Sequence, residues 1–295
     1  MLKSILFIYL FILTNIAFGQ SPGKVASNLQ WWFKANVGTS TVQDGGQIDS
    51  WVNNGGFVVS KTYRNALSTA GYPKFIASGI NFNPVIYFSA DNPAIFQTSP
   101  SNRSYMGPMA GNSSVFAVFL SNQKEGSIAG NVFYYTPNII STETGVSQRD
   151  YSLGFVEGKV AVKCDTIDDW VVNTNKLYVN AGPQIAAAVR SIQTNVNRPA
   201  DVQLLMNGRN EQNTNSVNTS YLLNSSNYVL ASAYYGLSIG ALTSQGQTSI
   251  NTYTTFDGDI AELIVYDRVL TGLELMHVNS YLAIKYGIKI GRAHV

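Results

Sequence analysis

The chain has 295 residues and a mass of 32.1 kDa, which is enough for one large β domain or two smaller ones. Only 12% of the residues are charged and the formal net charge is +2. Without a stripe of lysine and arginine, this balance argues against nucleic acid as a partner. The hydrophobic share of 45%, with aromatic residues throughout the chain, excludes a disordered protein.

Residues 1–19 have the pattern of a cleavable signal peptide. Lys3 is the basic start, an apolar run covers 5–13, and Ala17 and Gly19 supply the small residues before a cleavage site. The run is too short to cross about 30 Å of hydrocarbon, and no later stretch is apolar enough to do so. We therefore expect an exported protein that is secreted or held at the cell surface, with no transmembrane segment.

The mature chain has the pattern of many short strands joined by polar turns. Runs of strand length occur at 28–34, 48–52, 73–76, 84–88, 114–120, 152–155, 159–163, 176–179, 185–192, 202–207, 229–233 and 256–266. Strands at this spacing, with no helices between them, are typical of an all-β antiparallel sandwich or barrel. Asn207-Gly208 is the favoured pair for a tight hairpin turn, and the polar stretch 209–227 is expected to be mostly loop.

One helix is expected, and it is the last element. Thr271 and Glu274 have the spacing of a capping box, and Gly287 supplies a left-handed stop. Apolar residues recur between them on one helical face, namely Leu275, Val278, Leu282 and Tyr286. This helix should pack on the sandwich at the end of the domain.

Both ends of the mature chain resemble a known family. The segment 29–38, LQWWFKANVG, followed by Asp49-Ser50-Trp51, is similar to the opening of laminin-G-like domains in secreted surface proteins of Bacteroidetes-type bacteria. The segment 256–288 resembles the closing of the same domains, and 81–88, NFNPVIYF, also fits. The resemblance implies a concanavalin A-like jelly roll of two antiparallel sheets with one C-terminal helix. Relatives serve as carbohydrate-binding or protein-binding modules, often with calcium, and a few are glycoside hydrolases, so fold alone does not select a function.

We expect one such domain over residues 20–289. The final residues, 290–295, match the translation of the start of a common sequencing adapter. They are therefore expected to be non-native, and the intact protein is expected to continue into further C-terminal domains.

The most enzyme-like motif consists of Asp257, Asp259 and Glu262. Its spacing is similar to a strand motif of sandwich glycoside hydrolases, in which retaining enzymes use two carboxylates about 5–5.5 Å apart. Three observations count against catalysis: the shorter Asp257 stands at the nucleophile position beside a glycine, the motif lies on the last strand, and noncatalytic relatives share it. We therefore assign no catalytic residue and keep this trio as the alternative.

Calcium is the cofactor that the sequence leaves open. Asp257 and Asp259, two apart on a strand, point the same way, and carboxylate oxygens suit this ion. The competing interpretation is that both side chains accept hydrogen bonds from turn amides at the strand end.

Aromatic rings near predicted turns or loops are candidates for ligand binding, because flat rings stack on the apolar faces of sugars. The candidates are Trp51, Tyr134, Tyr135, Trp170, Tyr234 and Tyr235. Core packing is the competing interpretation for each. The adjacent tyrosine pairs are the more informative, because neighbours in a strand point to opposite faces. Trp31 and Trp32 should likewise divide between the core and a position outside the sheet or under the helix.

These features predict a noncatalytic carbohydrate-binding or adhesion module of a secreted or cell-surface protein. Its partner would be a glycan or a cell-surface protein. Two alternatives remain: a glycoside hydrolase acting on a polysaccharide, and a structural spacer domain in a larger surface protein.

Overall fold

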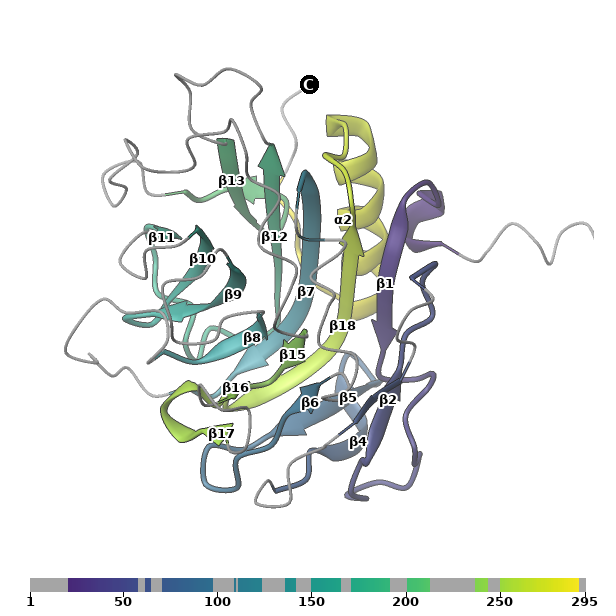
Figure 1. Ribbon diagram of the computed structural model, residues 1–295. Helices are drawn as coiled ribbons and strands as arrows, with labels where there is room; N and C mark the ends of the chain where they lie inside the picture. The colour runs from purple at the N-terminus through teal and green to yellow at the C-terminus, as the bar shows by residue number, and fades with distance from the viewer. Residues whose placement is uncertain are drawn as a thin grey trace, which may run out of the picture.

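The protein is a sandwich of two antiparallel sheets with a helix on the outer face of one of them (Figure 1). The computed structural model describes residues 21–57, 62–64, 71–97, 109, 111–123, 136–141, 150–165, 171–191, 201–212, 237–243 and 250–291. Within these residues, the all-β fold class with one C-terminal α-helix is confirmed. No helix in this part of the chain is long and apolar enough to cross a membrane.

The first sheet, sheet A, is built around the last strand of the chain. Its order is β14 (Arg209–Asn210), β13 (Asp201–Met206), β12 (Gln184–Ser191), β7 (Ser113–Ser121), β18 (Gly258–Tyr266), β5 (Asn83–Phe88) and β4 (Lys74–Ile80), with β1 (Leu29–Lys34) also paired to β18. Strand β18 pairs with β7 on one side and with β5 and β1 on the other. It is therefore central and buried along nearly its whole length, which explains its almost continuous apolar sequence.

The second sheet, sheet B, contains several very short strands. Its order is β11 (Val171–Asn173), β10 (Lys159–Asp165), β9 (Asp150–Val156), β8 (Asn138–Ser141), β15 (Ser238–Ile239), β6 (Phe96–Gln97), β3 (Thr62–Arg64) and β2 (Ser50–Val52). A separate hairpin pairs β16 (Leu242–Thr243) with β17 (Ile250–Asn251), and two 3-10 turns, η2 (Pro22–Lys24) and η8 (Thr252–Thr254), precede β1 and β18. Strands of two or three residues are too short to show a period, so β3, β6 and β15 leave no sequence signal.

The predicted hairpin turn at Asn207-Gly208 is confirmed. Both residues are left-handed, with φ of 51° and 73°, as a type I′ turn requires. The predicted strand at 176–179 is wrong, because these residues form an irregular segment beside β11. Tyr178 and Val179 are nevertheless buried, so their apolar character indicated burial without strand pairing. The predicted strand 229–233 lies outside the described residues.

Two apolar layers hold these elements together. The layer between the sheets includes Trp31, Trp51, Phe88, Phe96 and Phe119. The layer between sheet A and the terminal helix α2 (Gly272–Tyr286) includes Trp32, Phe116, Tyr266, Val278 and Leu282. Trp31 and Trp32 thus divide between the two layers, as the alternation of side chains along β1 predicts.

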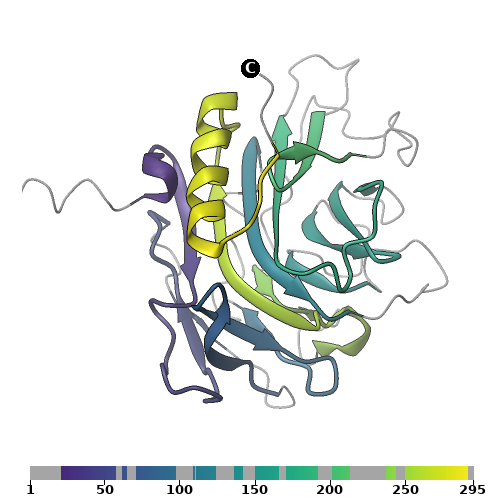
Figure 2. The same ribbon diagram turned by 180° about the vertical axis from the view of Figure 1, so that it is seen from behind.

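Helix α2 begins and ends at the predicted residues. The Thr271 hydroxyl accepts from the Glu274 amide while the Glu274 carboxylate accepts from the Thr271 amide, and Gly287 ends the helix with a φ of 63°. Figure 2 shows the helix along the outer face of sheet A, with the following segment turning back toward β13. There the Gly291 amide donates to the Asn207 carbonyl, so the first part of the 290–295 segment packs on the domain.

Candidate functional site

A β-bulge on β18 places the predicted acidic motif on one face of sheet A. The register between β18 and β7 shifts between Ile260 and Glu262. Ile260 and Leu263 pack between the sheets, whereas Ala261 packs under helix α2. Three residues apart on a regular strand, Asp259 and Glu262 would point to opposite faces. The extra residue of the bulge brings both to the outer face of the sheet.

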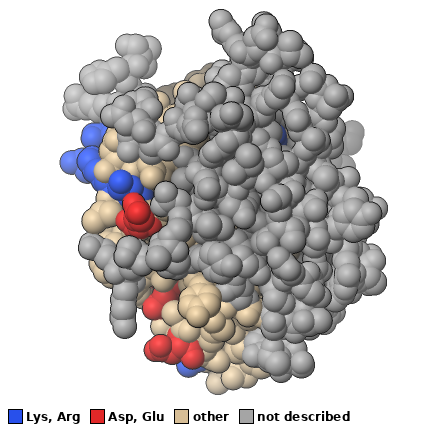
Figure 3. All heavy atoms as spheres, turned by 60° about the vertical axis from the view of Figure 1, so that its left-hand side comes forward, with Lys and Arg blue, Asp and Glu red and all other residues tan. Residues whose placement is uncertain are grey.

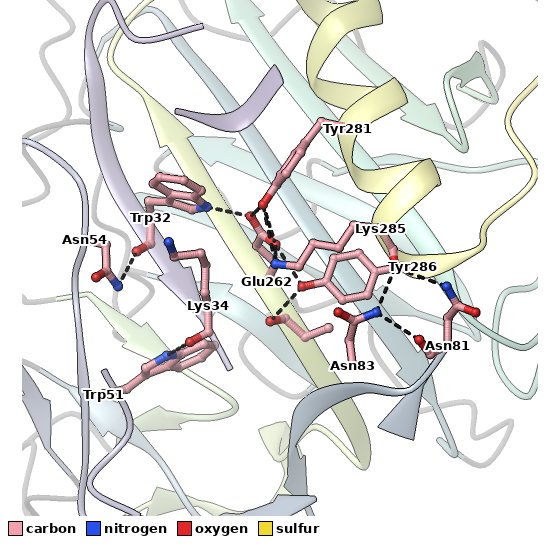
Figure 4. A network of polar contacts seen from close by, with 11 residues as sticks. Trp32, Lys34, Trp51, Asn54, Asn81, Asn83, Glu262, Tyr281, Lys285 and Tyr286 are labelled. Atoms are coloured by element: carbon pink, nitrogen blue, oxygen red, sulfur yellow. Dashed lines mark hydrogen bonds and ion pairs between the residues drawn. The ribbon is translucent and has the colours of Figure 1, made fainter. Parts of the chain in front are cut away.

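Glu262 is the centre of a buried polar network between sheet A and helix α2 (Figure 4). Only 1% of the residue is exposed. One carboxylate oxygen, Oε1, accepts from Trp32 Nε1 at 2.5 Å and from the Tyr281 hydroxyl at 3.0 Å. The other, Oε2, accepts from Lys285 Nζ at 2.7 Å and from the Tyr286 hydroxyl at 2.8 Å. Each carboxylate oxygen therefore accepts from two donors. These four interactions compensate for the burial of the negative charge of Glu262.

Lys34 is a second residue of strand β1 beside this network, in addition to Trp32. Its Nζ lies 3.7 Å from the centroid of the Trp32 ring, a cation–π contact, and the residue stands opposite Glu262 in the strand register. Burial lowers the pKa of Lys34, against the raising effect of the Glu262 charge, and Lys285 lowers it further. One carboxylate thus joins β1, β18 and α2, which are far apart in the sequence.

The chemistry of this network is suited to holding helix α2 on sheet A. Burial, together with the charge of Glu262, raises the pKa of Tyr281 and Tyr286 well above the ordinary range, so both hydroxyls remain protonated donors. A general acid or nucleophile must reach the reacting sugar, whereas Glu262 is enclosed by four donating side chains. This geometry argues against the catalytic alternative for Glu262 and explains why an acid interrupts an apolar strand.

Asp257 and Asp259 lie outside that network. The Asp257 amide donates to the side chain of Gln123 at 3.0 Å and its carbonyl accepts from the Asn122 amide at 2.9 Å, so its backbone is tied to the end of β7. Asp259 is partly buried and stands between Tyr87 and Leu120 of the neighbouring strands. The described part of the chain holds no group of three or more His, Cys, Asp or Glu side chains that could bind a metal. Calcium binding at these two aspartates stays a prediction.

Asp259 should make stability depend on pH. Burial raises the pKa of its carboxyl from 3.8 to about 6. The folded protein therefore binds this proton more tightly than the unfolded chain, and the contribution of Asp259 to the free energy of unfolding rises as the pH falls from about 6 toward 4. Asp259→Asn should stabilise the protein at pH 7, by on the order of 1 kcal/mol after solvent screening, and should have little effect at pH 4.

Thermal melts at the two pH values measure this difference. Asp91→Asn, on an exposed turn, is the control and should change neither melt. An equal effect of Asp259→Asn at both pH values would contradict the assignment.

Trp51 belongs to the core, which corrects its assignment to ligand binding. The side chain is fully buried and its Nε1 donates to the Lys34 carbonyl at 3.0 Å. Its ring lies 5.3 Å from that of Phe33 and 6.0 Å from that of Phe96, between centroids. A ring enclosed in this way offers no face to a sugar.

The other aromatic candidates lie outside the described residues; they are Tyr134, Tyr135, Trp170, Tyr234 and Tyr235.

Sequence reasoning missed the partners of Glu262 and the most exposed aromatic residue among those that the structure describes. A signal for the first was present, because an acid within a buried apolar strand needs a buried cation or several donors. The second is Phe82, which is 89% exposed in the turn between β4 and β5. The signal for Phe82 was its place in a two-residue Asn-Phe turn. Turns of this kind usually carry Asn-Gly, so a phenylalanine there is unusual.

The described charges on one flank of the sandwich are mixed in sign. On the face shown in Figure 3, the described basic and acidic side chains lie next to one another. Lys176 and Glu211, which pair at 3.1 Å, show the same alternation. The described part of this face thus offers little of the single-sign field that attracts polyanions.

Neither a family model nor a curated protein matches the sequence. Solved structures are similar in fold. The binding domain of Paraclostridial Mosquitocidal Protein 1 is 11% identical with a TM-score of 0.49, over 87% of this chain and 53% of that one. Domain 4 of AbnA, a GH43 extracellular arabinanase from Geobacillus stearothermophilus solved with arabinotriose, is 11% identical with a TM-score of 0.47, over 85% and 98%.

The Ruminococcus gnavus IT-sialidase CBM40, bound to alpha2,3 sialyllactose, is 13% identical with a TM-score of 0.42, over 82% of this chain and all of that one. The chain spans about half the length of the mosquitocidal protein's binding domain. At these identities the similarity concerns the fold alone and assigns no role to any residue of this chain.

Proposed function

We propose that this chain is a noncatalytic binding module of an exported protein, with a glycan as its ligand. The observation that carries the choice of a module over an enzyme is the enclosure of Glu262. The acid that a glycosidase would use instead holds helix α2 on the sheet, through Lys285 and three uncharged donors.

The choice of a glycan rests on the aromatic residues and the low charge. Adjacent tyrosines at 134–135 and 234–235 lie near predicted turns or loops, and two neighbouring rings cannot share one buried side of a strand. With only 12% charged residues, the surface suits a neutral, hydroxyl-rich ligand better than a strongly charged partner. Export, signalled by the leader at 1–19, would bring the module to such glycans, and the resemblance to laminin-G-like domains supports the same role.

A glycan array and a reducing-sugar assay test this function together. The mature chain should bind a restricted set of glycans and release no reducing sugar. Release that is lost in a folded Glu262→Gln variant would overturn the proposal in favour of a glycoside hydrolase. If the chain neither binds a glycan on the array nor releases reducing sugar, the structural spacer is favoured instead. Running the array with calcium and with a chelator shows whether the predicted ion contributes.

A further inference from the structure

Phe82 occupies a backbone position that disfavours it. Asn81 and Phe82 connect β4 to β5 with φ of 47° and 60°, and Ile80 stands opposite Asn83. Two left-handed central residues are the mark of a type I′ turn, which favours Asn-Gly. Asn81 fits its position, whereas a bulky side chain at the second position is strained.

Packing does not compensate for this strain. Phe82 is 89% exposed, the highest value among the large apolar side chains that the structure describes. By contrast, Trp31, Trp51 and Phe33 are fully buried. A strained residue persists where its surroundings impose the conformation, and such residues cluster at ligand-binding positions.

The surroundings do hold this turn in place. The side-chain amides of Asn81 and Asn83 both donate to the Lys285 carbonyl, at 3.2 and 2.7 Å (Figure 4). The Asn83 amide also donates to the Asn81 carbonyl at 3.0 Å. Gly287 lies against Asn81, where an added Cβ would be 2.9 Å from the Asn81 side chain. Because Lys285 is itself held by Glu262 at 2.7 Å, the turn presents the Phe82 ring from a rigid base.

We propose that Phe82 is a sugar-contact residue, whose ring stacks on the apolar face of a pyranose; this inference rests on the proposed glycan-binding function. Because the backbone of the turn is already held, a ligand that covers Phe82 has to order only its side-chain torsions, so binding costs little conformational entropy. Ile284, 81% exposed, directly precedes Lys285, whose carbonyl anchors the turn, so a second exposed apolar residue lies one position from that anchor in the sequence.

The size and charge of this surface favour a sugar. A stable protein interface takes about 20–30 residues on each side, whereas one aromatic ring matches the face of one sugar ring. The polar groups that fix the turn are neutral amides, and the charge of Lys285 is paired with Glu262. The surface therefore suits a neutral ligand.

Two variants of Phe82 separate binding from folding. Both Phe82→Gly and Phe82→Ala should weaken glycan binding about tenfold, because both remove the ring. The Gly variant should melt a few °C above the Ala variant, because only glycine is unstrained in this conformation. Phe82→Trp should keep the binding. Tyr253→Ala, which removes another exposed aromatic ring, is the matched control and should leave binding unchanged.

Affinity electrophoresis in native gels that contain soluble arabinan, xylan, mannan or β-glucan is the assay. Retardation of the wild type that is lost in both small variants supports the assignment. Equal retardation of wild type and Phe82→Gly would overturn this inference and leave the proposed function standing. A wild type that no polysaccharide retards would overturn both.

Two further results would also contradict the assignment of Phe82 as a sugar-contact residue. If the Ala variant melts above the Gly variant, the backbone strain that motivates it is not present. If size-exclusion chromatography shows a wild-type dimer that dissociates in Phe82→Gly, the ring contacts a second copy of the chain and not a sugar.

Discussion

Replacing Glu262 with alanine should destabilise the protein by about 3–5 kcal/mol. The substitution leaves the partly buried Lys285 ammonium without its carboxylate, and it removes the acceptor of Trp32 Nε1 and of two tyrosine hydroxyls. The cost arises mainly from these unpaired donors. A buried polar group without a partner has lost its hydrogen bonds to water and gains none in the protein. Urea unfolding of wild type and variant measures the difference.

The control for this prediction is an ion pair at the surface. Lys176→Ala removes a side chain that is 68% exposed from its ion pair with Glu211, and should cost less than about 1 kcal/mol. Adding Lys285→Met to Glu262→Ala should recover part of the lost stability, because the uncompensated charge is then removed as well. A loss below about 1 kcal/mol for Glu262→Ala would show that the network does not hold helix α2 to the sheet.

Trp51→Ala should cost about 3–5 kcal/mol, as expected for truncation of a large buried ring. Trp51 is fully buried between the sheets and packs against Phe33 and Phe96. The variant also loses the hydrogen bond to the Lys34 carbonyl. Trp51→Phe, which keeps most of the packing and loses only that bond, should cost considerably less.

Binding measured on the folded fraction separates packing from ligand contact. Glycan affinity of Trp51→Phe should equal that of the wild type, since the ring does not reach the surface. Tyr253→Ala is the exposed control and should change stability by less than about 0.5 kcal/mol. Wild-type stability combined with lost binding in Trp51→Ala would restore Trp51 as a sugar-contact residue.

The expected loss at Glu262 has its structural origin in the position of β18. This strand comes near the end of the chain yet lies in the middle of sheet A, between β7 and the pair β5 and β1. Trp32 and Lys34 on β1 meet Glu262 on β18 and Lys285 on α2. The first and last elements of the domain are thus joined directly, so sheet A is complete only when the C-terminal segment has docked.

Local features of the sequence predicted local features of the fold. Two predicted features depend on residues that are close in the sequence, and both are confirmed. They are the capping box of Thr271 and Glu274 and the turn at Asn207-Gly208. The alternation of Trp31 and Trp32 predicted their division between two layers, since the period of a strand is fixed by its backbone. By itself the sequence therefore determined the all-β class and the terminal helix, whereas export stays a prediction from the leader at 1–19.

Contacts between distant residues were decided only by the tertiary structure. Whether Trp51 faced a ligand or the core depended on Phe33 and Phe96 around it, and no local pattern encodes that packing. The bulge that turns Glu262 toward α2 arises from its register with β7, and the carboxylate finds its lysine 23 residues further along the chain. Local hydrogen bonds and strand periodicity act within a few residues, whereas burial and charge pairing depend on which segments the whole fold brings together.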